Sequence, residues 1–270
     1  MSSPPIVLIH GLWMTPRSWD KFAERYTAAG HTVHAPSWPG LEGDVEAIRA
    51  DPSPLSSLTI SKIVDHYEKL IRELDSPPII MGHSFGGLVT QILLDRGLGA
   101  AGVAIDPAPP KGVLVIPPAS LRVASVSLRN PGNRHRAQML TAKQFHFAFG
   151  NTLSEADSQA VYERYAVPGP GRTLFQAGLA NFNPQAATKI NFHNDDRAPL
   201  LILGGGKDHT VPAASTRSNF KLQQKSAAVT EYKEYADRSH YTCGEPGWEA
   251  VADHALEWAV AQAASRAIPH

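Results

Sequence analysis

The amino-acid sequence predicts an α/β fold: a mostly parallel, twisted sheet with helices on both faces. Short apolar runs rich in β-branched residues, such as Ile6–Ile9 and Ala101–Ile105, are typical of strands buried on both faces. Stretches with apolar residues at helical spacing lie between these runs. Strand and helix alternate along much of the chain, and this order favours parallel strands joined by right-handed crossovers.

Length and composition favour one ordered domain. A chain of 270 residues suits a single α/β core with room for an insertion. Hydrophobic residues make up 43% of the chain and charged residues 19%, as is ordinary for a globular protein. Lys and Arg together number 25, as do Asp and Glu, and the sequence contains no block of like charges. We therefore expect neither nucleic acid nor a membrane as a partner.

Cysteine usage and the N-terminus indicate the compartment. Cys243 is the single cysteine, which excludes an intrachain disulfide and suits a reducing environment. The N-terminal residues contain no basic segment and lead directly into a short strand, unlike a secretory signal. No apolar run approaches the ~20 residues that a membrane-spanning helix needs. A soluble cytoplasmic protein is expected.

The first part of the chain follows the alternation of strand and helix. After the strand at Ile6–Ile9, Ser18 is a candidate N-cap for a helix that Gly30 ends. Thr32–Pro36 is the next expected strand, and residues 42–58, rich in Pro, Asp and Ser, are expected to be mostly loop. A long helix follows, with an apolar stripe formed by Ile60, Ile63, Val64, Tyr67, Leu70, Ile71 and Leu74.

Residues 111–197 interrupt this order. They begin with a Pro-punctuated apolar run at Val113–Pro118 and continue as short helix-like segments. We expect them to form a mainly helical cap, inserted into a core made of residues 1–110 and 198–270. Eight residues of the segment are aromatic: Phe145, Phe147, Phe149, Tyr162, Tyr165, Phe175, Phe182 and Phe192.

The core pattern resumes after the inserted segment. Pro199–Leu203 is an expected buried strand, and a helix through Phe220 follows it. Glu231–Tyr235 alternates in polarity and predicts a final edge strand. The last helix is expected to begin near Glu245 or Trp248.

The segment Ile79–Val89 carries the strongest indication of function. An apolar run leads into the sequence G-H-S-F-G at residues 82–86, and a helical pattern begins at once. A G-x-S-x-G sequence between a strand and a helix is the context of a nucleophile elbow. The two outer glycines allow strand and helix to approach closely, and the turn presents Ser84 at a helix N-terminus, which favours developing negative charge.

Three further motifs accompany the elbow. His10-Gly11 follows the first strand, Gly206-Lys207-Asp208 follows the strand at Pro199–Leu203, and Ser239-His240 follows the last strand. On these motifs the chain resembles the α/β-hydrolase superfamily over residues 7–108 and 199–258. Only about five residues precede the first strand, so the resemblance implies a trimmed sheet of about six parallel strands.

The resemblance implies a catalytic triad in the chain order Ser, acid, His. Ser84 would be the nucleophile, Asp208 the acid and His240 the base. A carboxylate at Asp208 would accept a hydrogen bond from Nδ1 of His240 and stabilise the imidazolium that forms during the reaction. Asp106, which also follows a strand, is the alternative acid, although the proline after it suits a structural turn.

The superfamily pattern also implies an oxyanion hole. Its donors would be the N–H of Phe85 and an N–H of the loop at residues 10–13, either Leu12 or, less in keeping with the pattern, Trp13. The candidate substrate-binding residues are Trp13, Phe145, Phe149 and Tyr241. The aromatic residues of the cap would either line an apolar pocket or form a small core of the cap itself.

The predicted activity is hydrolysis of a carboxylic ester or lactone of an apolar, medium-sized substrate through an acyl-enzyme, as in a serine esterase, carboxylesterase or lactonase. No cofactor is expected. The histidines are scattered, and neither H-E-x-x-H nor C-x-x-C occurs, so no metal site is expected. The glycines at 204–206 lack the spacing of a phosphate-binding loop, and Asp208 would repel phosphate.

Other functions remain open on the same residues. They are cofactor-free haloperoxidase chemistry, C–C bond hydrolysis or lysis, and binding without catalysis. Hydroxynitrile lyases resemble the chain at its start but carry Lys directly after the catalytic His, where this chain has Tyr241. Haloalkane dehalogenases use Asp at the position of Ser84. No motif separates a linear ester from a lactone, thioester or amide, or predicts the oligomeric state.

Overall fold

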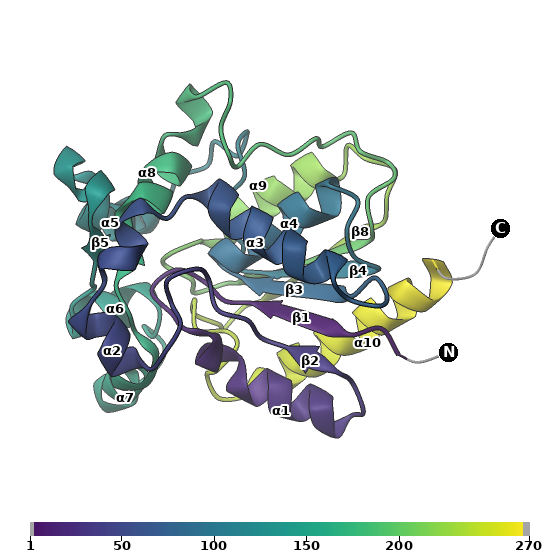
Figure 1. Ribbon diagram of the computed structural model, residues 1–270, viewed down its shortest axis with the longest axis horizontal. Coiled ribbons are helices and arrows are strands. Elements are labelled where there is room, and N and C mark those ends of the chain that lie inside the picture. Colours follow the sequence, from purple (N-terminus) through teal and green to yellow (C-terminus); the bar gives the residue numbers. More distant parts are fainter. Residues whose placement is uncertain (1–2, 267–270) are drawn as a thin grey trace.

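The computed structural model describes residues 3–266 and contains a six-stranded sheet between layers of helices (Figure 1). The strand order is β2-β1-β3-β4-β7-β8, and every neighbouring pair is parallel. The strands are β1 (Ile6–Ile9), β2 (Val33–His34), β3 (Ile79–His83), β4 (Ala101–Ile105), β7 (Leu200–Gly205) and β8 (Thr230–Tyr235). The predicted fold class, with about six parallel strands, is confirmed.

Helices cover both faces of the sheet. Those of the two layers are α1 (Asp20–Ala28), α3 (Ile60–Arg72), α4 (Phe85–Asp95), α9 (Ala213–Gln223) and α10 (Trp248–Arg266). In Figure 1, α3, α4 and α9 lie over one face and α1 and α10 over the other. Adjacent strand residues point to opposite faces, so Ile80 packs with the residues of α3 and α4, whereas Met81 packs with those of α1 and α10. Both faces of the central strands β1, β3, β4 and β7 are buried, which is why these strands are almost wholly apolar.

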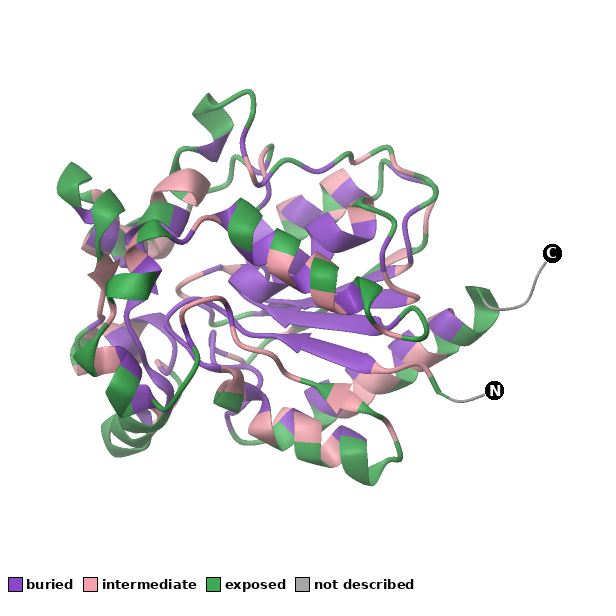
Figure 2. Cartoon of the chain, viewed as in Figure 1, coloured by how far each residue is buried: buried purple, intermediate pink, exposed green. Residues whose placement is uncertain are grey.

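The helices of the layers are amphipathic, as Figure 2 shows by the exposed outer surfaces of α1, α3 and α10. In α3, the predicted stripe from Ile60 to Ile71 faces the core, and charged residues occupy the opposite side. Within residues 3–266, no helix combines the length and the apolar content needed to cross a membrane.

Between β4 and β7 the chain forms a group of short elements at the end of the sheet where the strands terminate (Figure 1). The helices are α5 (Pro118–Leu128), α6 (Ala142–Ala148), α7 (Glu155–Tyr165) and α8 (Gly171–Gly178), with the 3-10 helices η3 (Pro131–His135) and η4 (Ala180–Phe182). Two short strands, β5 (Ala137–Gln138) and β6 (Gly169–Pro170), pair antiparallel. The segment thus places helices directly over the carboxyl ends of the central strands.

Two local predictions were wrong. Ser18 does not cap α1, because a 3-10 helix (η1, Pro16–Trp19) precedes α1 and the Ser18 hydroxyl donates to the carbonyl of Thr15. Residues 42–58 are not mostly loop, since they form α2 (Val45–Ala50) and the 3-10 helix η2 (Ser53–Ser57). Asp44 accepts a hydrogen bond from the Ala47 N–H, so a polar residue that suggested a loop is a helix cap.

Candidate active site

Ser84 lies in the sharp turn between β3 and α4. Its backbone angles are φ 55° and ψ −118°, a conformation that costs energy for a residue other than glycine. A Cβ on Gly82 would lie 2.1 Å from the carbonyl oxygen of Gly86, and a Cβ on Gly86 would lie 2.0 Å from the carbonyl oxygen of Ile9. Strand and helix therefore approach so closely that only glycine fits at these two positions.

The side chains of Ser84, His240 and Asp208 form a continuous hydrogen-bonded array. Nε2 of His240 lies 2.9 Å from Oγ of Ser84, and Nδ1 of His240 lies 2.6 Å from Oδ2 of Asp208. All three side chains are buried. The structure therefore brings together the three residues that the sequence proposed, although more than half of the chain separates the first from the last.

The hydrogen bonds around Asp208 fix the tautomer of His240. Oδ1 of Asp208 accepts from the N–H groups of Thr210 and Val211, at 2.7 Å and 2.8 Å. Since these donors favour the ionised carboxylate, Oδ2 accepts the Nδ1–H of His240. Nε2 of His240 is then left unprotonated and accepts a hydrogen bond from the hydroxyl of Ser84.

Burial shifts the pKa values of both ionisable partners. Desolvation lowers the pKa of His240 below the ordinary value for histidine, because the imidazolium cannot be hydrated there. Burial also raises the pKa of Asp208, and the N–H groups of Val211 and Thr210 act in the opposite direction. The imidazole is therefore neutral at neutral pH and free to accept a proton.

The loop that carries His240 is held by buried hydrogen bonds. Glu245, which is buried, accepts from the Ser239 N–H at 2.9 Å and from the hydroxyls of Ser239 and Thr152. Nε2–H of His83 donates to the carbonyl of His240 at 2.8 Å. In the sequence Glu245 is a candidate helix start, and no local pattern reveals its role in fixing this loop.

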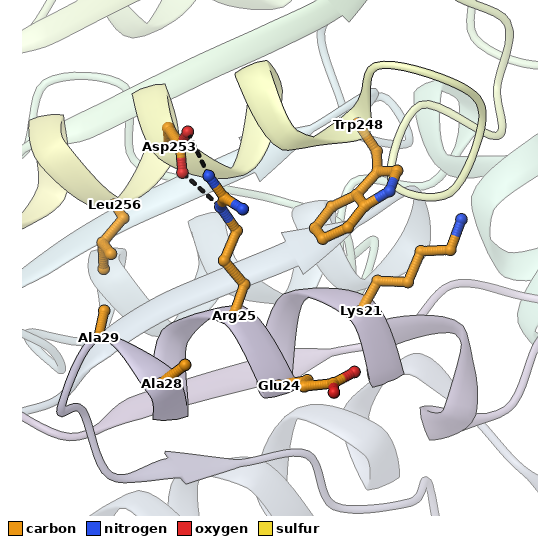
Figure 3. A pocket seen from close by; sticks show the side chains of 8 residues that line it. All are labelled: Lys21, Glu24, Arg25, Ala28, Ala29, Trp248, Asp253 and Leu256. Atoms are coloured by element: carbon orange, nitrogen blue, oxygen red, sulfur yellow. Dashed lines mark hydrogen bonds and ion pairs between the residues drawn. The ribbon is translucent and has the colours of Figure 1, made fainter.

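Helix α1 also anchors this loop from outside. Nζ of Lys21 donates to the carbonyl of Gly244 at 2.8 Å, while Arg25 donates to both carboxylate oxygens of Asp253 on α10. Figure 3 shows these side chains around the Trp248 ring, in a surface groove of about 530 Å³. The two cations of the groove are already partnered, so the groove joins α1, α10 and the His240 loop and offers no unpartnered cation to a ligand.

The predicted oxyanion donors lie beside Ser84. Leu12, Trp13 and Phe85 line the same cavity as Ser84. Among the described residues, no hydrogen bond uses the main-chain N–H of Leu12 or Phe85, so both donors are available. Trp13 has a φ of 63°, and its ring Nε1 and its carbonyl are bonded to Gln138 and Val167. These bonds tie the loop to the segment between β4 and β7.

A cavity of about 160 Å³ opens at Ser84. Its walls are contributed by the residues after β4, α5, α8 and η4, and they are mainly aliphatic. Six of the aliphatic lining residues are Val113, Ile116, Val123, Ala124, Leu174 and Ala177. No local pattern of the sequence marks these residues, because the packing of α5 against α8 and the path of the chain after β4 bring them beside Ser84.

Three of the predicted substrate-binding residues lie elsewhere. Phe145, Phe149 and Tyr241 are buried and are not among the residues that line the cavity. Phe149 stacks on Phe145 at 4.7 Å and meets the edge of the His240 ring at 4.9 Å, and its carbonyl accepts the Tyr241 N–H. These aromatic residues form a core that supports His240 from behind, whereas Trp13 does line the cavity.

Asp106 is not bonded to His240. Its Oδ1 accepts from the Gly205 N–H at 2.6 Å, and its φ of 44° places it in a strained turn after β4. Ring nitrogens of His83 and His240 and a carboxylate oxygen of Asp106 lie within 4.8 Å of one another, a set that a metal ion could use. However, both nitrogens of His240 are engaged by Ser84 and Asp208, so the geometry suits proton transfer better than metal ligation.

Comparisons with known proteins agree with this architecture. The model of a family described as "Alpha/beta hydrolase family" matches residues 6–254. An extracellular alpha/beta-hydrolase from a Paenibacillus species is 23% identical with a TM-score of 0.67, and the match covers 94% of this chain and 98% of that one. A monoacylglycerol lipase from Paleococcus ferrophilus is 21% identical with a TM-score of 0.66, covering 96% of each chain. Polyneuridine aldehyde esterase is 16% identical with a TM-score of 0.67, covering 95% of this chain and 99% of that one. No curated protein sequence matches the chain.

Proposed function

The chain belongs to the alpha/beta hydrolase family, and on this premise we propose that it is a serine hydrolase of carboxylic esters or lactones. The observation that carries the proposal is the buried array of Ser84, His240 and Asp208 beside two unused main-chain N–H groups. A hydroxyl, an imidazole and a carboxylate in this order make the nucleophile, base and orienting group of acyl transfer.

The reaction would proceed in two steps. Nε2 of His240 takes the proton of Ser84 as Oγ attacks the carbonyl carbon, and the N–H groups of Phe85 and Leu12 stabilise the tetrahedral oxyanion. His240 then gives the proton to the leaving alkoxide, and an acyl-enzyme remains. Water, deprotonated by His240, attacks the acyl carbon, and the acid departs as Ser84 regains its proton. Asp208 stabilises the imidazolium in both steps.

The cavity supports an apolar substrate of medium size. Its aliphatic walls carry no charged side chain, and binding there would exclude water from the acyl group. Residues 111–197 supply much of this wall, and we assign them the role of a cap over a core of residues 1–110 and 198–270. Linear esters and lactones both present an acyl carbon of the required kind.

A fluorophosphonate probe and a panel of p-nitrophenyl esters and lactones test the proposal. The probe should label the protein, and Ser84→Ala should abolish labelling and reduce kcat by at least about 10⁴-fold while leaving the fold intact. Ser120→Ala is the matched control, because Ser120 lines the same cavity outside the hydrogen-bonded array. Substantial hydrolysis by Ser84→Ala, or an equal loss in Ser120→Ala, would refute the role of Ser84.

A further inference from the structure

Large exposed hydrophobic side chains gather around the mouth of the cavity. Of the seven found among the described residues, Val229 is remote in sequence and the other six lie between residues 114 and 182. These six, which we call the apolar rim, are Leu114, Val115, Ile116, Leu121, Leu179 and Phe182. Phe182 is 85% exposed and Leu114 is 74% exposed, values that are costly for side chains in water without a partner.

The apolar rim is continuous with the cavity wall. Val115 and Ile116 are exposed and also line the cavity. Ala180 and Asn181 of η4 line it immediately before exposed Phe182. Asn181 joins the two parts of the rim, since its side chain accepts from the Gly112 N–H at 2.8 Å and donates to the carbonyl of Val113 at 2.9 Å.

Helix α5 has two distinct faces at this place. Val123 and Ala124 point into the cavity, whereas Leu121, Arg122 and Arg129 are exposed. The outer face of α5 and the C-cap residue that follows it thus present an apolar side chain together with two cations. A helix face of this composition is typical of a surface that lies against the headgroups of a lipid layer.

The two stretches of sequence that carry the rim contain cations and no carboxylate. Residues 107–154 contain six Lys or Arg and no Asp or Glu, and residues 164–194 contain three Lys or Arg and no Asp or Glu. The total charge of zero, from which we expected no membrane partner, hides this distribution, because the cations are spaced rather than consecutive. All acidic residues of the chain lie outside these two segments.

We propose that the apolar rim docks on the surface of an anionic lipid bilayer. Arg122 and Arg129 would contact anionic headgroups, and the rim side chains would enter the interfacial layer. A second copy of the chain is the less suitable occupant, because two such surfaces would oppose cation to cation with no carboxylate between them. Docking would turn the cavity mouth toward the lipid, so that an apolar ester could enter without crossing water.

Vesicle flotation tests this docking independently of catalysis. The Ser84→Ala variant is used as the parent so that lipid is not hydrolysed, with vesicles of phosphatidylcholine alone or mixed with phosphatidylglycerol. The parent should float with the mixed vesicles and lose binding at high salt. In this parent, Arg122→Gln and Arg129→Gln should each weaken binding about fivefold, and Ile116→Ser and Phe182→Ser should weaken it as well.

Two matched controls lie away from the rim. Val229→Ser removes an exposed hydrophobic side chain just before β8, at the opposite end of the sheet, and Lys221→Gln removes an exposed cation of α9. Both should leave binding unchanged, with circular dichroism verifying that every variant folds. Failure of the parent to float with anionic vesicles, or equal losses in the controls, would overturn the proposal. So would a dimer in light scattering that Phe182→Ser dissociates without any vesicle binding. Ester hydrolysis by the Ser84 protein is measured separately, so failure of docking is distinct from failure of the proposed activity.

Discussion

Burial and hydrogen bonding act together on His240. Desolvation disfavours the imidazolium, and the carboxylate of Asp208 at 2.6 Å confines the ring proton to Nδ1. The two effects differ in timing. Burial keeps the base neutral before the reaction, and the carboxylate stabilises the charge that appears during it.

The pH dependence of kcat/KM follows from this balance. The base must be neutral to act, and its pKa is lowered, so activity should persist below the ordinary histidine pKa of about 6.5 and fall only at more acidic pH. The profile is measured on a neutral ester by titrating the released acid. An acid limb centred above about 6.5 would show instead that the charge of Asp208 outweighs desolvation.

Replacing Asp208 and Asp106 in turn shows which of these two carboxylates is the acid of the triad. Asp208→Asn removes the acceptor that fixes the His240 tautomer, and kcat should fall by about 10⁴-fold without unfolding. Asp106→Asn is the matched control, since Asp106 is buried like Asp208. Its Oδ1 accepts a hydrogen bond from the Gly205 N–H, and the amide oxygen of Asn can accept the same bond. We expect Asp106→Asn to retain most activity. The reverse order of effects would make Asp106 the acid.

At the level of elements, sequence motifs predicted the local structure around Ser84, whereas contacts between residues distant in the sequence could not be predicted. The strand, the G-x-S-x-G turn and α4 follow one another in the sequence, so the position of Ser84 could be deduced directly. Glu245 could not be recognised, because its hydrogen bonds to Ser239 and Thr152 depend on the folded loop. Polar residues such as Asp44 misled the prediction of residues 42–58, since caps and loops use the same residue types.

Because β1 and α4 approach closely, a single added methyl group at Gly86 should lower the free energy of unfolding strongly. In Gly86→Ala the new Cβ would lie 2.0 Å from the carbonyl oxygen of Ile9, a backbone atom of the central sheet that has little room to move. We expect a loss of about 3 kcal/mol in the free energy of unfolding, measured by urea titration. Gly132→Ala is the control, because its nearest neighbour is a side-chain oxygen of Asn130 at 3.2 Å and the site is exposed. Equal stability of Gly86→Ala and the unmodified protein would show that strand and helix can separate.

For the whole molecule, the sheet could be predicted and the cavity could not. The central strands β1, β3, β4 and β7 are compact buried runs, whereas the cavity wall combines residues from the loop after β1 to α9 that no local pattern relates. The sequence left open whether the aromatic residues of the cap line the pocket or form a core. Phe145 and Phe149 form a core against His240, and smaller aliphatic residues face Ser84. The cytoplasmic location remains a prediction.

The acyl group of the substrate should occupy the cavity beside α5, and two neighbouring positions on this helix test that placement. Ala124 lines the cavity, whereas Ser125 is exposed and its hydroxyl donates to the carbonyl of Arg122. Ala124→Phe would fill part of the 160 Å³ space and leave the Ser84 array untouched. Ser125→Phe adds the same ring on the solvent side.

We expect Ala124→Phe to shift the preference among p-nitrophenyl esters toward short acyl chains. The kcat/KM value should fall about 10-fold for each methylene that no longer fits, while the shortest ester is hydrolysed nearly as before. Ser125→Phe should keep the original chain-length profile. If both variants shift the profile equally, or neither does, the acyl group lies outside this cavity, because a ring inside it must compete with the acyl chain for the same volume.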